Sequence, residues 1–167
     1  MFRIILFLLL ILPINAFAYQ CNADIDKMAS EYNIHIFCDS KNSKSSNITG
    51  EAPNKKLLNQ FSPYLKIFLN SYNRSLLEKN IEEIFILEDL RRNGYEVGGV
   101  SNGRQIFVCL DHYSNPEAAY MKILHHEFSS NIYKANDLNF ILKWKSISKD
   151  KYDYSESFNI KCINDFK

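Results

Sequence analysis

The sequence has few glycines and prolines, no CxxC cysteine pair and no excess of charge of either sign. Five glycines and four prolines stand beside 14% aromatic residues. This composition excludes a low-complexity or disordered chain and indicates a packed globule. Lysine and arginine number 20, aspartate and glutamate 19. Such a balance argues against a nucleic-acid partner or an anionic membrane surface, since both prefer basic proteins.

Long apolar runs are absent except at the N-terminus. Residues 4–14 are apolar, Arg3 precedes them, and Ala16-Phe17-Ala18 follows. This order is typical of a signal peptide cleaved after Ala18, and the run is too short for a good membrane span. We therefore expect a signal peptide at 1–18 and a single domain at 19–167. The mature chain would be exported, periplasmic or secreted, with no membrane span and a net charge of 19 minus 19, or zero.

All four cysteines follow the predicted cleavage site: Cys21, Cys38, Cys109 and Cys162. An even count in an exported chain predicts two disulfides, for which three pairings exist. We favour Cys21–Cys38 with Cys109–Cys162, because the first closes a short loop and the second ties the tail to the core. The alternative is a zinc cluster, which the lack of CxxC spacing disfavours.

Hydrophobic periodicity predicts an α+β fold with a small, mostly antiparallel sheet packed with helices. We expect helices over 54–72, 74–80, 115–134 and 137–147, and strands over 34–38, 81–87, 95–100 and 104–110. Residues 19–32 read as a short helix or coil, 39–53 as an exposed loop, 89–94 as a turn, 101–103 as a hairpin turn, and 158–162 as a short strand or tail. Gly98-Gly99 has no phosphate-loop context and predicts a bulge or a close backbone approach.

The helix predicted over 115–134 carries His125-His126-Glu127-Phe128-Ser129-Ser130. In a zinc hydrolase helix, two histidines four residues apart reach one ion, and a glutamate after the first takes a proton from zinc-bound water. His126 and Glu127 match the first ligand and the base. Ser130 stands where the second histidine is required, and a neutral hydroxyl is a weak zinc ligand. A His-Glu pair alone is a weak signal and is also compatible with a structural pair.

Other polar residues near this motif have simpler interpretations. His125 points about 100° away from His126 and is expected to be a hydrogen-bonded core or boundary histidine. His112, before the helix, is a ligand candidate from outside it, but is more typical of a surface or capping residue. Ser129 and Ser130 lack the strained, exposed turn that serine hydrolases use for a nucleophile.

Residues 57–134 resemble a family of zincin-type metallopeptidases among exported bacterial proteins. The matching segments are 80–87, 93–100, 105–108 and Leu124-His-His-Glu-Phe128. The resemblance implies a zincin-like fold, a zinc ligand at His126 and a catalytic base at Glu127. It also implies a histidine where this chain has Ser130, and a third ligand downstream. Asp137, Asp150, Asp153 and Glu156 are candidates for that ligand by position only.

The motif and the resemblance lead to two functional hypotheses, and a third hypothesis does not depend on either. The favoured one is a degenerate, non-catalytic zincin-like protein with a binding or structural role, for which a peptide or protein is the expected ligand. The alternative is a zinc-dependent hydrolase or peptidase with an atypical ligand set. Losing one of three imidazoles should cost several kcal/mol of metal affinity, which favours the first. The third is a disulfide-bonded exported protein unrelated to zincins.

Overall fold

The computed structural model describes residues 21–41, 43 and 45–135. Within these residues the chain is an α+β fold, as the sequence predicts. The helices are α1 (Ala23–Tyr32), α2 (Lys55–Asn70), α3 (Arg74–Asn80) and α4 (Pro116–Ala135). The strands are β1 (His35–Phe37), β2 (Ile48–Glu51), β3 (Glu83–Arg92), β4 (Tyr95–Glu96), β5 (Gly99–Asn102) and β6 (Gln105–Cys109). No helix in this part of the chain is long and apolar enough to cross a membrane.

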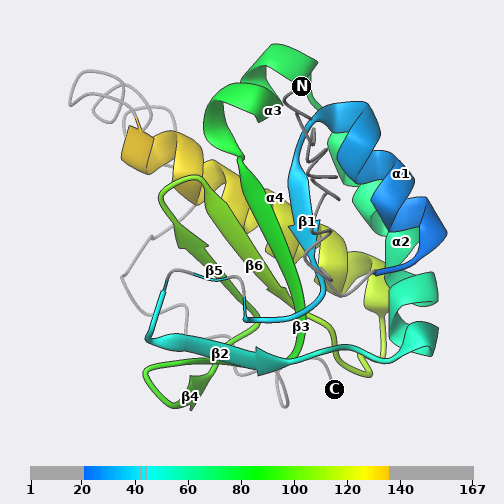
Figure 1. The fold of residues 1–167 in the computed structure, drawn as a ribbon, viewed down its shortest axis with the longest axis vertical. Helices are drawn as coiled ribbons and strands as arrows, with labels where there is room; N and C mark the ends of the chain where they lie inside the picture. Colours follow the sequence, from blue (N-terminus) through cyan, green and yellow to red (C-terminus); the bar gives the residue numbers. More distant parts are fainter. Residues whose placement is uncertain (1–20, 42, 44, 136–167) are drawn as a thin grey trace, which may run out of the picture.

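The sheet is mixed, with its main path in the order β1-β3-β6-β5 (Figure 1). β3 pairs in parallel with both β1 and β6, whereas β5 pairs antiparallel with β6. β2 and β4 pair antiparallel with the distal part of β3. Three of the five pairings are thus antiparallel, while the centre of the sheet is parallel. The β5–β6 hairpin occupies one end of the path, so β5 is its edge strand.

The four described helices contribute to one core, on one face of the sheet. In Figure 1, α4 runs behind the strands, with α1 and α2 to one side. Phe61, Leu65 and Phe68 of α2 are fully buried in this core, as are Leu124 and Phe128 of α4. Pro63 lies inside α2 and does not end it. The apolar stripe of α2 is therefore core, as its periodicity predicts.

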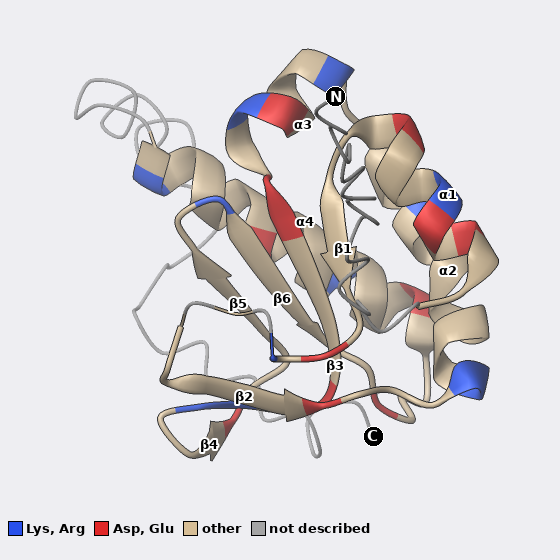
Figure 2. Cartoon of the chain, viewed as in Figure 1, with Lys and Arg blue, Asp and Glu red and all other residues tan. Residues whose placement is uncertain are grey.

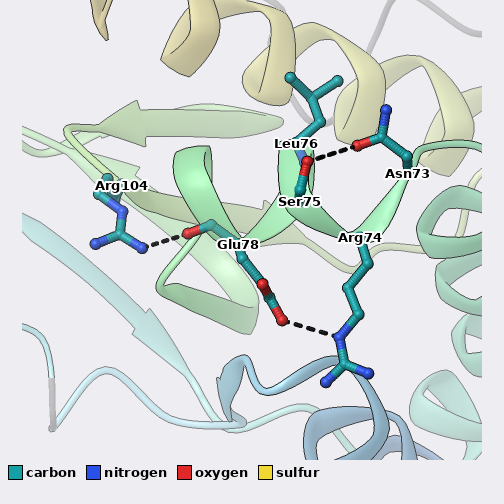
Figure 3. A network of polar contacts seen from close by, with 6 residues as sticks. All are labelled: Asn73, Arg74, Ser75, Leu76, Glu78 and Arg104. Atoms are coloured by element: carbon teal, nitrogen blue, oxygen red, sulfur yellow. Dashed lines mark hydrogen bonds and ion pairs between the residues drawn. The ribbon is translucent and has the colours of Figure 1, made fainter.

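The short helix α3 is capped by its own sequence and attached to the β5–β6 turn (Figure 3). The Asn73 side chain accepts a hydrogen bond from the Leu76 amide at 2.8 Å, and Arg74 Nε lies 2.8 Å from Glu78 Oε1. Arg104, in the turn, donates to the Glu78 carbonyl at 2.6 Å. This contact holds the hairpin end against α3 and so helps to place β5 beside α4.

Four predicted segments are wrong. The hairpin turn predicted over 101–103 lies at Gly103-Arg104, because Ser101 and Asn102 continue strand β5. The segment 39–53 contains strand β2, because Ile48 is buried against β3 although its neighbours are polar. The segment 89–94 is not all turn: β3 continues to Arg92, and only Asn93-Gly94 form the tight turn, with φ of 53° and 82°. Positive φ at both positions matches a two-residue hairpin turn. The strand predicted over 95–100 is instead two strands, β4 and β5.

The disulfide Cys21–Cys38 is present and connects the start of α1 to the residue after β1. Cys109 is buried on β6, whereas Cys162 lies outside the described residues, so the Cys109–Cys162 pairing stays a prediction. The predicted signal peptide, the helix over 137–147 and the segment 158–162 also lie outside them.

Candidate functional site

The motif helix α4 begins as predicted. The Asn115 side chain accepts a hydrogen bond from the Ala118 amide at 3.2 Å, and Pro116 occupies the first helical position. The helix is apolar on two sides, because it packs on α2 with one face and on the β5–β6 hairpin with another. Its residues toward the hairpin recur every four positions: Ile123, Glu127 and Asn131, all buried. Two-sided burial explains why the hydrophobic pattern of this helix is broad.

Glu127 lies beneath the edge strand β5 and is only 8% exposed. Gly99 makes this possible: a Cβ at that position would lie 2.9 Å from Glu127 Cγ and 3.0 Å from its Oε1. The predicted close backbone approach at Gly98-Gly99 is therefore confirmed at Gly99. Burial raises the pKa of Glu127 to about 7, while a hydrogen bond from Ser101 and the charges of Lys134 and Arg92 act against this rise.

Lys134 reaches back to the same place from two turns further along α4. Its Nζ donates to Ser101 Oγ at 2.9 Å and to the Ser101 carbonyl at 3.0 Å. Side chains on a helix tilt toward its N-terminus, so the amine returns toward Glu127. Lys134, Ser101 and Glu127 thus form a continuous polar chain from α4 to β5 and back to α4.

His126 lies next to the polar chain of Lys134, Ser101 and Glu127. It is more exposed to solvent than Glu127, with 42% of its side chain exposed. Its Nε2 lies 3.9 Å from Glu127 Oε1. Burial, followed by the charges of Lys122 and Lys134, lowers the pKa of His126 and favours the neutral imidazole. Ser130, one turn further on, is half-buried. The structure thus brings His126 and Glu127 together, and adds a cation that the motif does not include.

His125 belongs to the helical core. Its Nδ1 lies 2.6 Å from the Tyr72 hydroxyl, and its ring packs edge-on against Phe68 with centroids 5.4 Å apart. Burial lowers the pKa of His125 and raises that of Tyr72. The prediction of a hydrogen-bonded boundary histidine is confirmed, and His125 has no part in the polar chain around Glu127.

Comparison of the chain with protein-family models, with curated proteins and with solved structures finds no match. The resemblance to zincin-type metallopeptidases therefore stays a prediction, and the geometry has to be judged on its own.

The donor set around His126 does not make a conventional zinc site within the described residues. No group of three or more His, Cys, Asp or Glu side chains in residues 21–41, 43 and 45–135 could hold a metal ion. His112 is exposed, and its amide donates to Asp111 Oδ1 at 2.7 Å. The positional candidates Asp137, Asp150, Asp153 and Glu156 lie outside these residues. His126, Glu127 and Ser130 therefore provide one imidazole, one buried carboxyl and a hydroxyl, next to an ammonium.

Sequence reasoning missed Ser101 and Lys134. Lys134 follows Glu127 by seven residues, a spacing that returns to nearly the same side of a helix, so this signal was readable. Ser101 gave no such signal, because its approach depends on the packing of β5 against α4. Within β3, charged residues lie at Glu83 and in the distal part from Glu88 to Arg92, whereas residues 84–87 and the paired residues 106–109 of β6 contain none (Figure 2).

Proposed function

We propose that the chain is an exported zincin-like protein that binds a peptide or protein ligand and does not hydrolyse it. The observation that carries the proposal is the position of Lys134. Its amine binds Ser101, which in turn donates to Glu127. An ammonium beside the motif repels a divalent cation, and water screens this repulsion only in part, because Lys134 is exposed while Glu127 is buried. The carboxylate that would act as the base is instead balanced by a side chain of the same helix.

The binding face that this proposal assigns is the outer edge of β5 beside α4. Gly98 accepts a hydrogen bond from the Cys109 amide at 2.9 Å, and Asn102 is directly opposite Gln105. In an antiparallel ladder these positions alternate with ones whose N–H and C=O point away from the partner strand. Gly99 and Ser101 therefore direct their backbone groups to the outer edge, where the Ser101 carbonyl already accepts a hydrogen bond from Lys134 Nζ. An extended peptide can add to such an edge through main-chain hydrogen bonds.

The zinc content of the purified mature protein tests whether the site holds the metal ion that hydrolysis would require. We expect fewer than about one zinc per ten chains, because one imidazole cannot offset the cost of ordering the site. The double variant Ser130→His with Lys134→Ala restores the imidazole and removes the ammonium, so it should bind zinc measurably. The matched control is Ser129→His with Lys134→Ala, which places the same imidazole about 100° away on the helix. Equal zinc binding by both double variants would contradict the assigned geometry.

Peptide binding needs a separate readout. A random-decapeptide library selected on the immobilised mature protein provides the probe, and amide shifts of the isotope-labelled protein locate the peptide. We expect shifts at Gly99 and Ser101, and none on β2, which lies on the distal part of β3. Failure to select any peptide, or shifts confined to another face, would reject a peptide ligand at β5.

One observation favours the alternative of a metal-dependent hydrolase with an atypical ligand set. The pKa of Glu127 is raised to about 7 by burial, and a base near neutral pH is what proton transfer requires. Further ligands would then have to come from Asp137, Asp150, Asp153 or Glu156. Stoichiometric zinc in the unmodified protein, with peptide hydrolysis that Glu127→Gln abolishes, would establish this alternative and overturn the first.

A further inference from the structure

A lysine occupies the far end of the outer edge of β5. This strand is the last of the main sheet path and lies beside α4 (Figure 1). Lys134 Nζ is 3.0 Å from the Ser101 carbonyl oxygen, so the acceptor that a longer added strand would need there is already bonded to an ammonium. One residue further along, the Asn102 side chain donates to Ser45 Oγ at 2.6 Å, which brings the loop before β2 against the end of β5. We therefore expect a strand added to this edge to stop at Ser101.

The Lys134 ammonium keeps one donor for a ligand. A lysine has three N–H donors, and within the part of the chain that the structure describes its hydrogen bonds go only to the carbonyl and Oγ of Ser101. Lys134 is exposed, so the third donor is accessible from solvent. The charge of Arg92 acts on the same place, since Arg92 and Lys134 both counter the rise in the pKa of Glu127. Glu127 itself is buried beneath β5, so the edge presents positive charge to an incoming chain.

We propose that the peptide bound at β5 is recognised by its C-terminal carboxylate and runs parallel to β5. This inference rests on the proposed function and adds the chemistry and the direction of the ligand. In a parallel ladder, the outward N–H and C=O of one residue bond two different residues of the partner strand. The last peptide residue donates its N–H to the Gly99 carbonyl, and its carboxylate accepts from the Ser101 N–H and from Lys134 Nζ. A terminal carboxylate has two oxygens for these two donors, and its bond to the ammonium is charge-assisted.

The other ways of placing a peptide on this edge are less favourable. An antiparallel peptide that stops at Ser101 brings its terminal ammonium to Lys134, and like charges repel. A peptide that continues past Ser101 finds the Ser101 carbonyl occupied, so its next N–H is left unpaired or the lysine is displaced. Leaving such a donor unpaired costs free energy. A free carboxylate is thus the chain end that fits the lysine.

Two random-hexapeptide libraries test the carboxylate, both N-acetylated, one ending in a free acid and the other in an amide. Each is passed over the immobilised mature protein, and acid peptides should be retained preferentially. The tightest acid peptide is then made again as its amide and with two glycines added at its C-terminus. Each of these forms should bind at least about tenfold more weakly, because a hydrogen bond between charged groups is lost.

The direction of the peptide has its own readout. A spin label at the N-terminus of the tightest acid peptide broadens the amide signals of protein residues close to it. A parallel peptide that ends at Ser101 places the label toward Val97 and Gly98, so these signals should broaden more than those of Asn102 and Gly103.

Variants of the lysine test its role directly. Lys134→Ala should remove the preference for the acid over the amide, whereas Lys134→Arg should keep most of it. Lys66→Ala is the matched control, because it removes the same charge from an exposed position on α2, and it should keep the preference. Circular dichroism shows whether each variant folds. Should Lys134→Ala fail to fold, the comparison of acid with amide on the unmodified protein decides alone.

Three outcomes would overturn the inference and leave the proposed function standing. One is equal binding of acid and amide at β5, as a peptide held by an aspartate or glutamate side chain would show. The second is equal binding of the glycine-extended form, and the third is a spin label that broadens Asn102 and Gly103 instead. Retention of no peptide from either library would reject peptide binding itself, and this inference with it.

Discussion

Glu127 is the residue at which chemical function and packing are hardest to separate. A glutamate with a pKa near 7 is typical of a general base, yet the first cause of its shift is burial under β5. The same burial would arise if the carboxyl only joined α4 to Ser101. Under the proposed function its neighbours favour the second role, because Lys134 supplies a positive charge where a hydrolase would have its zinc ion.

The burial of Glu127 makes the stability of the fold depend on pH. The folded-state pKa of about 7 exceeds the ordinary value of 4.5, so the folded chain binds the proton more tightly than the unfolded chain. The free energy of unfolding should therefore fall as pH rises from about 4.5 to about 7, by at most about 3 kcal/mol. In Glu127→Gln this fall should disappear. Urea unfolding at a series of pH values measures it.

The control for this experiment is Glu117→Gln, which changes an exposed carboxyl on the first turn of the same helix. It should keep the pH dependence of the unmodified protein. If Glu127→Gln shows the same slope as Glu117→Gln, the carboxyl of Glu127 does not take up a proton on folding.

At the scale of residues, the sequence alone identified those candidate residues that lie close to one another along the chain. His126, Glu127 and Ser130 lie on one helix, so their relation followed from a fixed turn per residue. The hydrogen-bonded state of His125 followed from its position beside the apolar stripe. The approach of Ser101 to Glu127 joins residues that are far apart in the chain, and nothing in either local pattern indicates it.

Among the elements, β5 against α4 is the contact on which the site depends. Gly99 allows this approach, and Asn131 extends it by donating to the Asn80 carbonyl at 3.2 Å and to the Gln105 carbonyl at 3.4 Å. The hairpin and the helix are thus fixed to each other on both sides of Glu127. This rigidity is what an edge strand needs if a peptide is to pair with it.

Gly99→Ala should disrupt this contact. The added Cβ would meet Ile123 Cγ2 at 2.8 Å and Glu127 Cγ at 2.9 Å, both on a packed helix face. Overpacking of this kind costs about 1–3 kcal/mol of the free energy of unfolding, which chemical denaturation measures. Thr49→Ala, at an exposed position on β2, is the control and should change stability by less than about 0.5 kcal/mol. A Gly99→Ala variant as stable as this control would show that β5 and α4 separate easily.

The sequence predicted the helices better than the sheet, for a physical reason. Helical periodicity and the Asn115 cap are local, and so is the turn at Asn93-Gly94, whereas the turn predicted over 101–103 lies at Gly103-Arg104. The parallel pairing of β3 with β1 and with β6 joins strands separated by helices or by other strands. Strand β2 was missed because a single buried residue, Ile48, joins it to β3.

For the whole molecule, the sequence predicts export, and the Cys21–Cys38 disulfide is consistent with it, because such bonds persist in oxidising compartments. The bond closes a loop with a sequence separation of 17. Loop-closure entropy then stabilises the fold by about 3 kcal/mol. A chain retained in a reducing cytosol would lack this contribution.

Expression in a bacterial host tests export and oxidation together. Mass analysis of the periplasmic fraction and the medium should find a chain that begins at Tyr19, with Cys21 and Cys38 linked. Replacing Leu9 and Leu10 by aspartate breaks the apolar run, so this variant should stay in the cytosol, keep residues 1–18 and have reduced thiols at both cysteines. The paired substitution Lys41→Asp with Glu51→Lys, at exposed positions of the domain, leaves the run intact and should be exported normally. An unmodified chain that keeps its first 18 residues and is found only in the cytosol would contradict the signal-peptide prediction, and with it the oxidising environment that the second disulfide requires.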